Sequence, residues 1–153
     1  MTRNVAVVRR FLRVAAVVVL GAGLAACGGG TTTPDTTTST VTTTLPTQPF
    51  SNLPAGAVAF AEVTINGAGV LTGTADWTFP SNDIDIYVTT PSCRAGDIVD
   101  LAGCQVLGHT TAVTAKPERL TVNVTQGNYR VWVANFGPSS ESGTLQMTAT
   151  VSR

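Results

Sequence analysis

Ionisable side chains are scarce in this chain of 153 residues: 12% of them are charged, and His109 is the only histidine. A lone imidazole without a positioned nucleophile beside it is a poor catalytic group. The sequence also lacks the H-E-x-x-H, G-x-S-x-G, phosphate-loop and dinucleotide-binding motifs. We therefore expect no catalytic site and a non-enzymatic protein.

Long hydrophobic runs are missing as well. The apolar segment at residues 14–26 has about 13 uncharged residues, whereas a helix that spans a bilayer needs ~20. Residues 1–13 contain four arginines and no acidic residue. A basic start followed by a short apolar run is typical of a secretory signal peptide, which we predict over residues 1–26.

The apolar run ends in Leu24-Ala25-Ala26-Cys27, which resembles the bacterial lipobox. That resemblance implies that Cys27 becomes the first residue of the mature protein and carries lipid; the alternative is an ordinary signal peptide with an incidental cysteine. Two or three acyl chains give lasting attachment, at ~0.8 kcal/mol for each buried CH₂ group. Gly28 follows the cysteine, and in bacteria with two membranes the lack of Asp there is associated with transfer to the outer membrane.

Basic residues are few after the signal segment. Five Lys or Arg residues stand against nine Asp or Glu residues from position 27 onward, for a net charge of −4. Nucleic-acid binding requires a basic surface that displaces counterions. We therefore expect no nucleic-acid partner.

Threonine dominates the next segment. Residues 31–49 contain eleven Thr, three Pro and a single charged residue, with no amphipathic period. Such a segment buries too little apolar surface to offset the entropy lost on ordering. We predict that residues 27–49 form the lipid anchor and a disordered or extended linker, followed by one folded domain over residues 50–153.

Strand patterns fill that domain. Residues 69–79 (GVLTGTADWTF) alternate between apolar and polar positions, and about six other segments show strand signals, whereas none has a convincing helical period. The Asn66-Gly67 pair is a typical hairpin signal. About seven short strands in a domain of this size predict an all-β antiparallel sandwich. The expected strands lie within residues 56–65, 69–79, 83–89, 104–109, 119–125, 128–136 and 143–151.

Cysteines number only three. If Cys27 carries lipid, Cys93 and Cys104 remain as a pair in an exported chain, and we predict a disulfide between them. It would close a loop between strands and stabilise the fold by about 2–3 kcal/mol in the chain-entropy model. Two free thiols or a metal site are the alternatives, although the close C-x-x-C pair typical of zinc sites is absent.

Residues 70–152 resemble the bacterial pre-peptidase C-terminal domain. The resemblance lies in DIDIYV at residues 83–88, KPERLTVNV at 116–124, GNYRVWVANF at 127–136 and SGTLQMTATV at 142–151. It implies a jelly-roll-like β-sandwich, usually an accessory to secreted proteases, with relatives that bind collagen, polysaccharide or calcium. This chain departs from the pattern in its Cys93–Cys104 loop, and we expect no attached protease.

Two closely spaced aspartates raise the hypothesis of a calcium site. Asp83 and Asp85 are two residues apart on an expected strand, so their side chains share one face. Calcium requires six to eight oxygen ligands, which Asp97 and Asp100 in the disulfide loop would help to supply. The alternative is that the first Asp ends a turn and the second is solvated or bonded to a loop amide. We expect no resident cofactor.

Two aromatic residues, Tyr87 and Trp132, fall on the outward-facing positions of their strands. They form a candidate ligand surface for a polysaccharide or an envelope protein, unless the disulfide loop covers them. Together these features predict a non-enzymatic lipoprotein that displays a β-sandwich at the bacterial cell envelope. A purely structural envelope module and a calcium-dependent binder are the alternatives.

Overall fold

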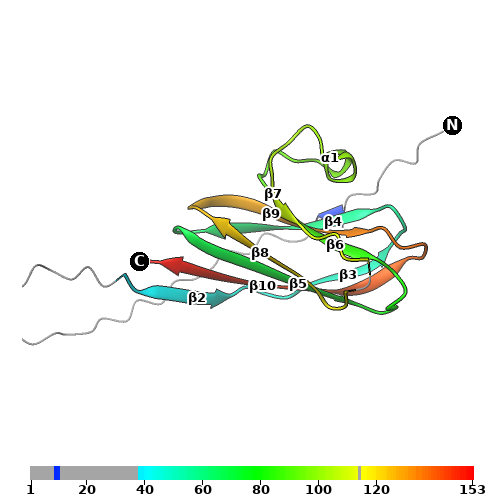
Figure 1. Cartoon of the computed structure of the whole chain (residues 1–153), viewed down its shortest axis with the longest axis horizontal. Coiled ribbons are helices and arrows are strands. Elements are labelled where there is room, and N and C mark those ends of the chain that lie inside the picture. Colours follow the sequence, from blue (N-terminus) through cyan, green and yellow to red (C-terminus); the bar gives the residue numbers. More distant parts are fainter. Residues whose placement is uncertain (1–8, 11–37, 114) are drawn as a thin grey trace, which may run out of the picture.

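The computed structural model describes residues 9–10, 38–113 and 115–153. Cys27, most of the predicted signal peptide and the first part of the predicted linker lie outside these described residues. Two sheets pack face to face, and a small excursion carrying one helix lies on the outer side of one of them (Figure 1). The predicted all-β sandwich is confirmed.

Each sheet contains five strands. The first, called the β9 sheet, has the order β1 (Arg9–Arg10), β4 (Val58–Ile65), β9 (Gly127–Asn135), β6 (Ile84–Thr89) and β7 (Val106–His109). The second, called the β10 sheet, has the order β2 (Thr40–Thr44), β10 (Glu141–Ser152), β5 (Gly69–Trp77) and β8 (Glu118–Val124), with β3 (Gln48–Leu53) also paired to β10. All pairs are antiparallel except β1 with β4. The seven predicted strands are present, and β1, β2 and β3 are additional.

The chain crosses repeatedly between the sheets, as in a jelly roll. From β3 to β6 every consecutive strand lies in the other sheet, and the same holds from β7 to β10. The hairpin predicted at Asn66-Gly67 is wrong, because β4 pairs along its whole length with β9 while β5 pairs with β10 and β8. Neither Asn66 nor Gly67 has the positive φ that the usual two-residue hairpin turn requires.

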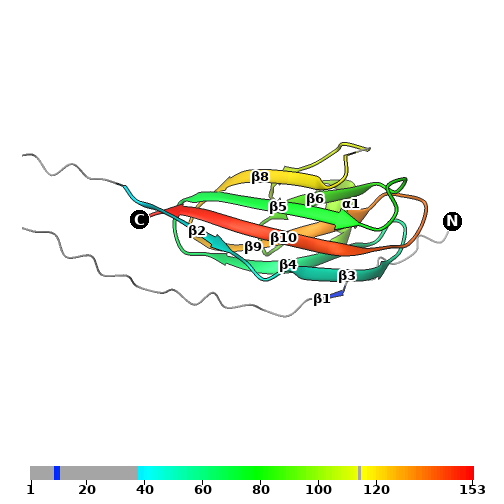
Figure 2. The same cartoon turned by 90° about the horizontal axis from the view of Figure 1, so that it is seen from below.

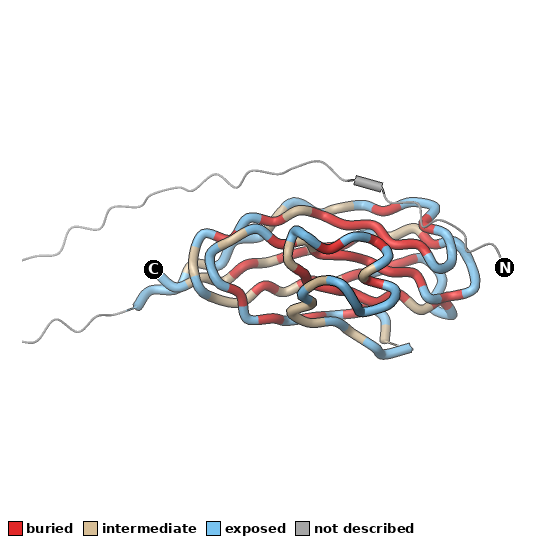
Figure 3. The backbone as a smooth tube through the Cα atoms, turned by 90° about the horizontal axis from the view of Figure 1, so that it is seen from above, coloured by how far each residue is buried: buried red, intermediate tan, exposed pale blue. Residues whose placement is uncertain are grey.

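The main core lies between the sheets and follows the predicted alternation. Leu71, Ala75 and Trp77 of β5 face Ile86 of β6 and Val131 of β9, and all are buried. Buried residues run through the middle strands, whereas the ends of the sandwich are mostly exposed (Figure 3). Burial of β-branched and aromatic side chains on these inner faces is the main stabilising contribution to the fold.

The predicted linker is partly wrong, because its second half joins the sheet. Strand β2 pairs with the last part of β10, and β3 pairs with its first part, so the two segments form one edge of the β10 sheet. Leu45, between them, packs against the main core, and Arg153 donates a backbone hydrogen bond of 2.8 Å to Ser39. The folded domain therefore begins near residue 38 rather than at residue 50, and β-branched threonines supply the edge strand.

One short helix was not expected from the sequence. Helix α1 (Ala95–Asp100) lies inside the disulfide loop, and Asp97 accepts a 2.7 Å hydrogen bond from the Arg94 backbone at its start. The helix ends at Leu101, which has a positive φ of 49°. Six residues are too few to display a helical period. Within the described part of the chain, no helix has the length and apolarity needed to cross a membrane.

Candidate functional site

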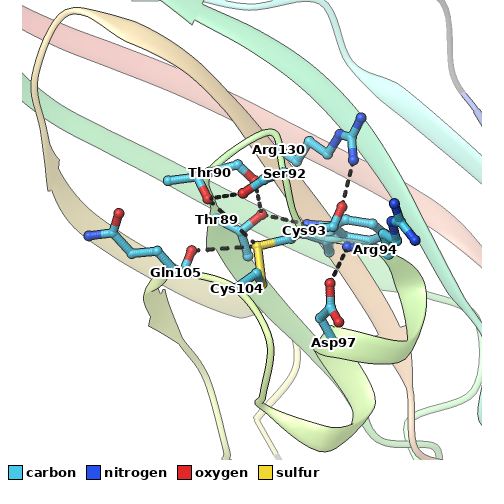
Figure 4. Close-up of a disulfide and its surroundings, with 10 residues drawn as sticks. Thr89, Thr90, Ser92, Cys93, Arg94, Asp97, Cys104, Gln105 and Arg130 are labelled. Atoms are coloured by element: carbon cyan, nitrogen blue, oxygen red, sulfur yellow. Dashed lines mark hydrogen bonds between the residues drawn. A yellow bond between two sulfur atoms is a disulfide. The ribbon is translucent and has the colours of Figure 1, made fainter.

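The segment between β6 and β7, residues 90–105, forms a cap on the outer face of the β9 sheet. We call it the disulfide cap, because Cys93 and Cys104 are bonded with a Cα–Cα distance of 5.2 Å (Figure 4). The predicted disulfide is confirmed. Beneath the cap lies a second hydrophobic cluster that joins residues of the cap to outward-facing residues of the sheet. Its buried members are Val58, Phe60, Tyr87, Cys93, Ala95, Ile98, Trp132 and Ala134.

Arg130 of β9 attaches the cap to the sheet. Its Nη1 atom donates a 2.6 Å hydrogen bond to the backbone carbonyl of Cys93, and Nη2 lies 3.2 Å from Glu62 Oε1 on β4. The guanidinium carbon lies 4.6 Å from the centroid of the Phe60 ring. One arginine thus combines a charge-assisted hydrogen bond, an ion pair and a cation–π contact.

The ligand surface predicted at Tyr87 and Trp132 is wrong. Both side chains are on the outward positions, as expected, but the cap and neighbouring residues leave Tyr87 only 4% and Trp132 only 1% exposed. Trp132 Nε1 donates to Thr89 Oγ1 at 2.9 Å, and Tyr87 stacks on His109 with 5.4 Å between ring centroids. The disulfide loop covers both rings, which was the alternative to an exposed ligand surface.

The carboxylates that the calcium hypothesis would bring together are instead hydrogen-bonded to different groups. Asp97 is bonded within α1, whereas Asp85 Oδ1 accepts a 3.3 Å hydrogen bond from Thr110. Among the described residues, no group of three or more His, Cys, Asp or Glu side chains is arranged to hold a metal ion. Asp83 instead receives backbone hydrogen bonds at its carbonyl from Phe136 and Gly137.

Asp85 is nonetheless electrostatically unusual. Burial raises its pKa from 3.8 to about 6, and the negative charges of Asp83 and Glu118 contribute in the same direction, against the lowering effect of Thr110. Burial also raises the pKa of Asp83, and the pKa of the Tyr87 phenol rises to about 12. Ionisation of Asp85 therefore opposes folding, because burial disfavours the charged form of its carboxyl group.

The connections at one end of the sandwich are held together by a buried carboxylate. Glu141, at the start of β10, accepts hydrogen bonds at Oε1 from the Phe79 backbone at 2.9 Å and from Asn82 Nδ2 at 2.8 Å. Its Oε2 atom accepts from the backbone N–H groups of Thr78 and Ser142, each at 3.2 Å. A carboxylate with this many donors fixes the loop that follows β5.

Asn135 and Asn82 fix the loop that follows β9 in the same way. Asn135 Nδ2 donates to the carbonyls of Leu53 and Ser139 at 2.9 and 2.7 Å, and its Oδ1 accepts from Gly137. Asn82 bonds to Ser139 in both directions. Because these two side-chain amides hydrogen-bond to groups of both loops, they hold the loops together as one rigid unit.

We call this end of the molecule the loop tip, formed by residues 54–57, 78–83 and 136–140. It lies opposite the end where β2 begins and the chain terminates (Figure 1, Figure 2). Two aromatic side chains on it face solvent, Phe79 with 55% and Phe136 with 42% of its surface exposed. The sequence analysis placed both at the last positions of expected strands, 69–79 and 128–136, and assigned them no binding role, whereas β5 ends at Trp77 and β9 at Asn135. The common signal is a Phe followed by a Pro one or two residues later, in FPSND and FGPSS.

Comparison with protein-family models finds no match, and no curated protein matches the chain. Among solved structures, the pre-peptidase C-terminal domain of a collagenase from Bacillus anthracis is similar at 9% identity and a TM-score of 0.47, covering 71% of this chain and 88% of that one. PliG, a periplasmic inhibitor of g-type lysozyme from Aeromonas hydrophila, has 12% identity and a TM-score of 0.42, with 73% and 86% coverage.

A carbohydrate-binding module of lichenase 5A from Cellvibrio mixtus, solved with cellotriose, is similar at 11% identity and a TM-score of 0.41, covering 71% of this chain and 95% of that one. These are distant structural similarities. At this level no binding site or activity transfers to the present chain.

Proposed function

We propose that this chain is a non-enzymatic envelope lipoprotein, in which a lipidated Cys27 and a threonine-rich segment tether a β-sandwich that engages an envelope protein or polysaccharide through its loop tip. The observation that carries the proposal is the pair of exposed rings, Phe79 and Phe136, on loops made rigid by the Glu141 network. Exposed aromatic side chains on a pre-organised surface are typical anchors of binding sites, because little entropy is lost when they are covered.

The placement of the two ends supports a display role. The described chain enters the sandwich beside the C-terminus, where Ser39 and Arg153 are hydrogen-bonded, and the loop tip lies at the other end. A tether attached at the entry end would hold the loop tip away from the membrane. The disulfide supports export, because such bonds persist in oxidising compartments outside the cytosol.

Among the described residues, the side chains best suited to chemistry make contacts that hold the fold together. The two cysteines are bonded to each other, His109 stacks on Tyr87, and Glu141 accepts loop hydrogen bonds. These roles favour a binding module over an enzyme. Membership of the pre-peptidase C-terminal family and placement in an outer membrane remain part of the proposal, supported by the sequence resemblances alone.

The test is retention of the purified full chain on isolated cell-wall polysaccharide and on an array of purified envelope proteins. We expect the variant with Phe79→Ser and Phe136→Ser to lose at least about ten-fold in retention on one of them while its melting temperature stays unchanged, because both rings are solvent-exposed. Val99→Ser with Leu101→Ser, which alters exposed apolar residues on and beside α1, is the matched control. Equal retention of both variants, or no retention of the wild type on either surface, would favour the purely structural module.

A further inference from the structure

The outer face of the β10 sheet is open to solvent. Figure 2 shows β10, β5 and β8 side by side on this face, and among the described residues no element lies across it. The outer face of the β9 sheet differs, because there the disulfide cap covers an apolar cluster. The chemistry of the open face is set by every second residue of its strands, since successive side chains of a strand point to opposite faces.

Threonines occupy these outward positions in register across β2, β10, β5 and β8. The neighbouring positions of opposite parity, such as Leu71, belong to the core between the sheets. Thr148 of β10 lies opposite Thr44 of β2 on one side and opposite Thr72 of β5 on the other. Thr72 in turn lies opposite Thr121 of β8. One row across the whole sheet, which we call the threonine row, is therefore made of four threonines.

The rows on either side extend the pattern along the strands. Thr42 lies opposite Thr150 in one of them, and Thr74 lies opposite Gln146 in the other. Three strands thus carry two threonines that face outward, two residues apart, within residues 42–44, 72–74 and 148–150. Hydroxyl and methyl groups repeat at about 4.8 Å from strand to strand and about 6.7 Å along each strand, which are the ordinary spacings of a sheet.

The hydroxyl groups of this array are held in place by one another. Thr42 Oγ1 and Thr150 Oγ1 are hydrogen-bonded at 2.8 Å, and Thr72 Oγ1 and Thr121 Oγ1 at 3.2 Å. A β-branched side chain also has few χ1 rotamers available on a strand. Each hydroxyl has one donor and two acceptor lone pairs, so it can still bond to a ligand. The face is therefore pre-organised, and little side-chain entropy is lost when it is covered.

The face carries little charge. Among the outward residues of its four strands the charged ones are Asp76 and Arg119, both toward the end of the sheet where β8 begins, and Asp76 is paired with Lys116 at 2.8 Å. A polyanion would require a basic surface. Sugar rings stack on aromatic side chains, and these outward positions carry none. Protein interfaces are anchored by aromatic residues and arginine, whereas threonine is under-represented among their anchors.

An uncharged lattice of small hydrogen-bonding molecules matches this array. The surface of an ice crystal is such a lattice, because each water molecule both donates and accepts hydrogen bonds and its oxygens repeat at spacings close to those of neighbouring strands. Threonine hydroxyls can take the place of lattice waters, and burial of the methyl groups releases the water that surrounds them. We propose that the outer face of the β10 sheet is an ice-binding surface centred on the threonine row. This site is separate from the loop tip and does not depend on lipidation.

The experiment grows ice slowly on a cold probe in a solution of the purified full chain and compares its concentration in the ice and in the remaining liquid. The wild type should be enriched in the ice. Thr72→Lys and Thr121→Lys, both in the threonine row, should each lower the ice-to-liquid ratio at least about ten-fold, because a hydrated charge is placed in the array. Thr64→Lys, at an exposed position on β4 of the other sheet, is the matched control and should keep the wild-type ratio.

Circular dichroism checks that each variant is folded, and the exposed position of Thr121 keeps the test valid if lysine at the half-buried Thr72 disturbs the sheet. Exclusion of the wild type from ice, or an equal loss in Thr64→Lys, would overturn the proposal. The variant with Phe79→Ser and Phe136→Ser should enter ice as the wild type does; its exclusion would assign the contact to the loop tip and overturn the proposal. Retention of the wild type on crystalline cellulose or chitin, abolished by Thr121→Lys, without enrichment in ice would assign the face to a polysaccharide and also overturn it.

Discussion

Arg130 and Cys93 are joined by a 2.6 Å hydrogen bond from the guanidinium Nη1 to the cysteine's backbone carbonyl, although they are 37 residues apart. The bond connects the central strand β9 to the disulfide cap, directly beside the half-cystine. The cap is therefore held to the sheet at the residue where its covalent closure begins. The buried Trp132 beneath it reports on whether the attachment is intact.

Replacing Arg130 by Met should lower the free energy of unfolding by about 1–3 kcal/mol. The variant leaves the Cys93 carbonyl without its charged donor and removes the ion pair with Glu62. Urea denaturation followed by tryptophan fluorescence measures the change. Arg119→Met, at an exposed position on β8, is the control and should stay within about 0.5 kcal/mol of the wild type. A loss equal to that of the control would show that the cap does not depend on Arg130.

Removal of the disulfide should open the cap before the sandwich unfolds. The variant with Cys93→Ser and Cys104→Ser loses about 2–3 kcal/mol in the chain-entropy model. In a Trp77→Phe background, where Trp132 is the remaining tryptophan, acrylamide quenching should increase because the ring loses its cover. Unchanged quenching in a still-folded variant would mean that the noncovalent contacts of the cap suffice.

Asp85 should make the folded state less stable as the pH rises. Its pKa is about 6 in the folded state against an ordinary 3.8, so the folded state binds more protons than the unfolded state between these values. Stability contributed by protonated Asp85 is therefore present near pH 4 and lost as the pH passes about 6. Asp85→Asn, which keeps the hydrogen bond with Thr110, should be more stable than the wild type by about 2 kcal/mol at pH 7, with the difference shrinking toward pH 4.

Thermal unfolding of both proteins at pH 4, 5, 6 and 7 measures this difference directly. Asp100→Asn, at an exposed position on α1, serves as the control for the removal of one negative charge. A stability difference between wild type and Asp85→Asn that is the same at every pH would contradict the assignment.

Glu141→Gln should loosen the loop tip. The amide group keeps one acceptor oxygen but presents an N–H₂ group to backbone N–H donors, so at least two of the four hydrogen bonds to Glu141 are lost. We expect a loss of about 2–3 kcal/mol and faster hydrogen exchange at residues 78–82. Exchange that changes equally across the whole sandwich would indicate global destabilisation and not a local role in the loops.

The period-two alternation of the sequence was sufficient to predict the main strands. In β5 and β8 it follows alternating burial, whereas β6 is buried on both faces. It missed β2, since a run of threonines has no alternation and its pairing depends on a strand about a hundred residues later. It also missed β3, which was placed partly in the linker.

The sequence correctly predicted that Tyr87 and Trp132 lie on the outward-facing positions of their strands. Those positions did not determine whether the two rings are buried. The cover comes from a loop whose path depends on the disulfide, on α1 and on Arg130. Conversely, Phe79 and Phe136 were expected at the ends of two strands, but β5 and β9 end before them, at Trp77 and Asn135. Their exposure follows from the way Glu141 and Asn135 bring distant loops together, which no local pattern encodes.

Intact mass spectrometry of the protein from the membrane fraction of its native cells tests the tethered-display account most directly. The account predicts a chain that begins at Cys27, heavier than the bare polypeptide by a diacylglyceryl group with or without an amide-linked acyl chain, and two hydrogens lighter through the Cys93–Cys104 bond. A chain that retains Met1, or one in which residue 27 carries a free thiol, would contradict it.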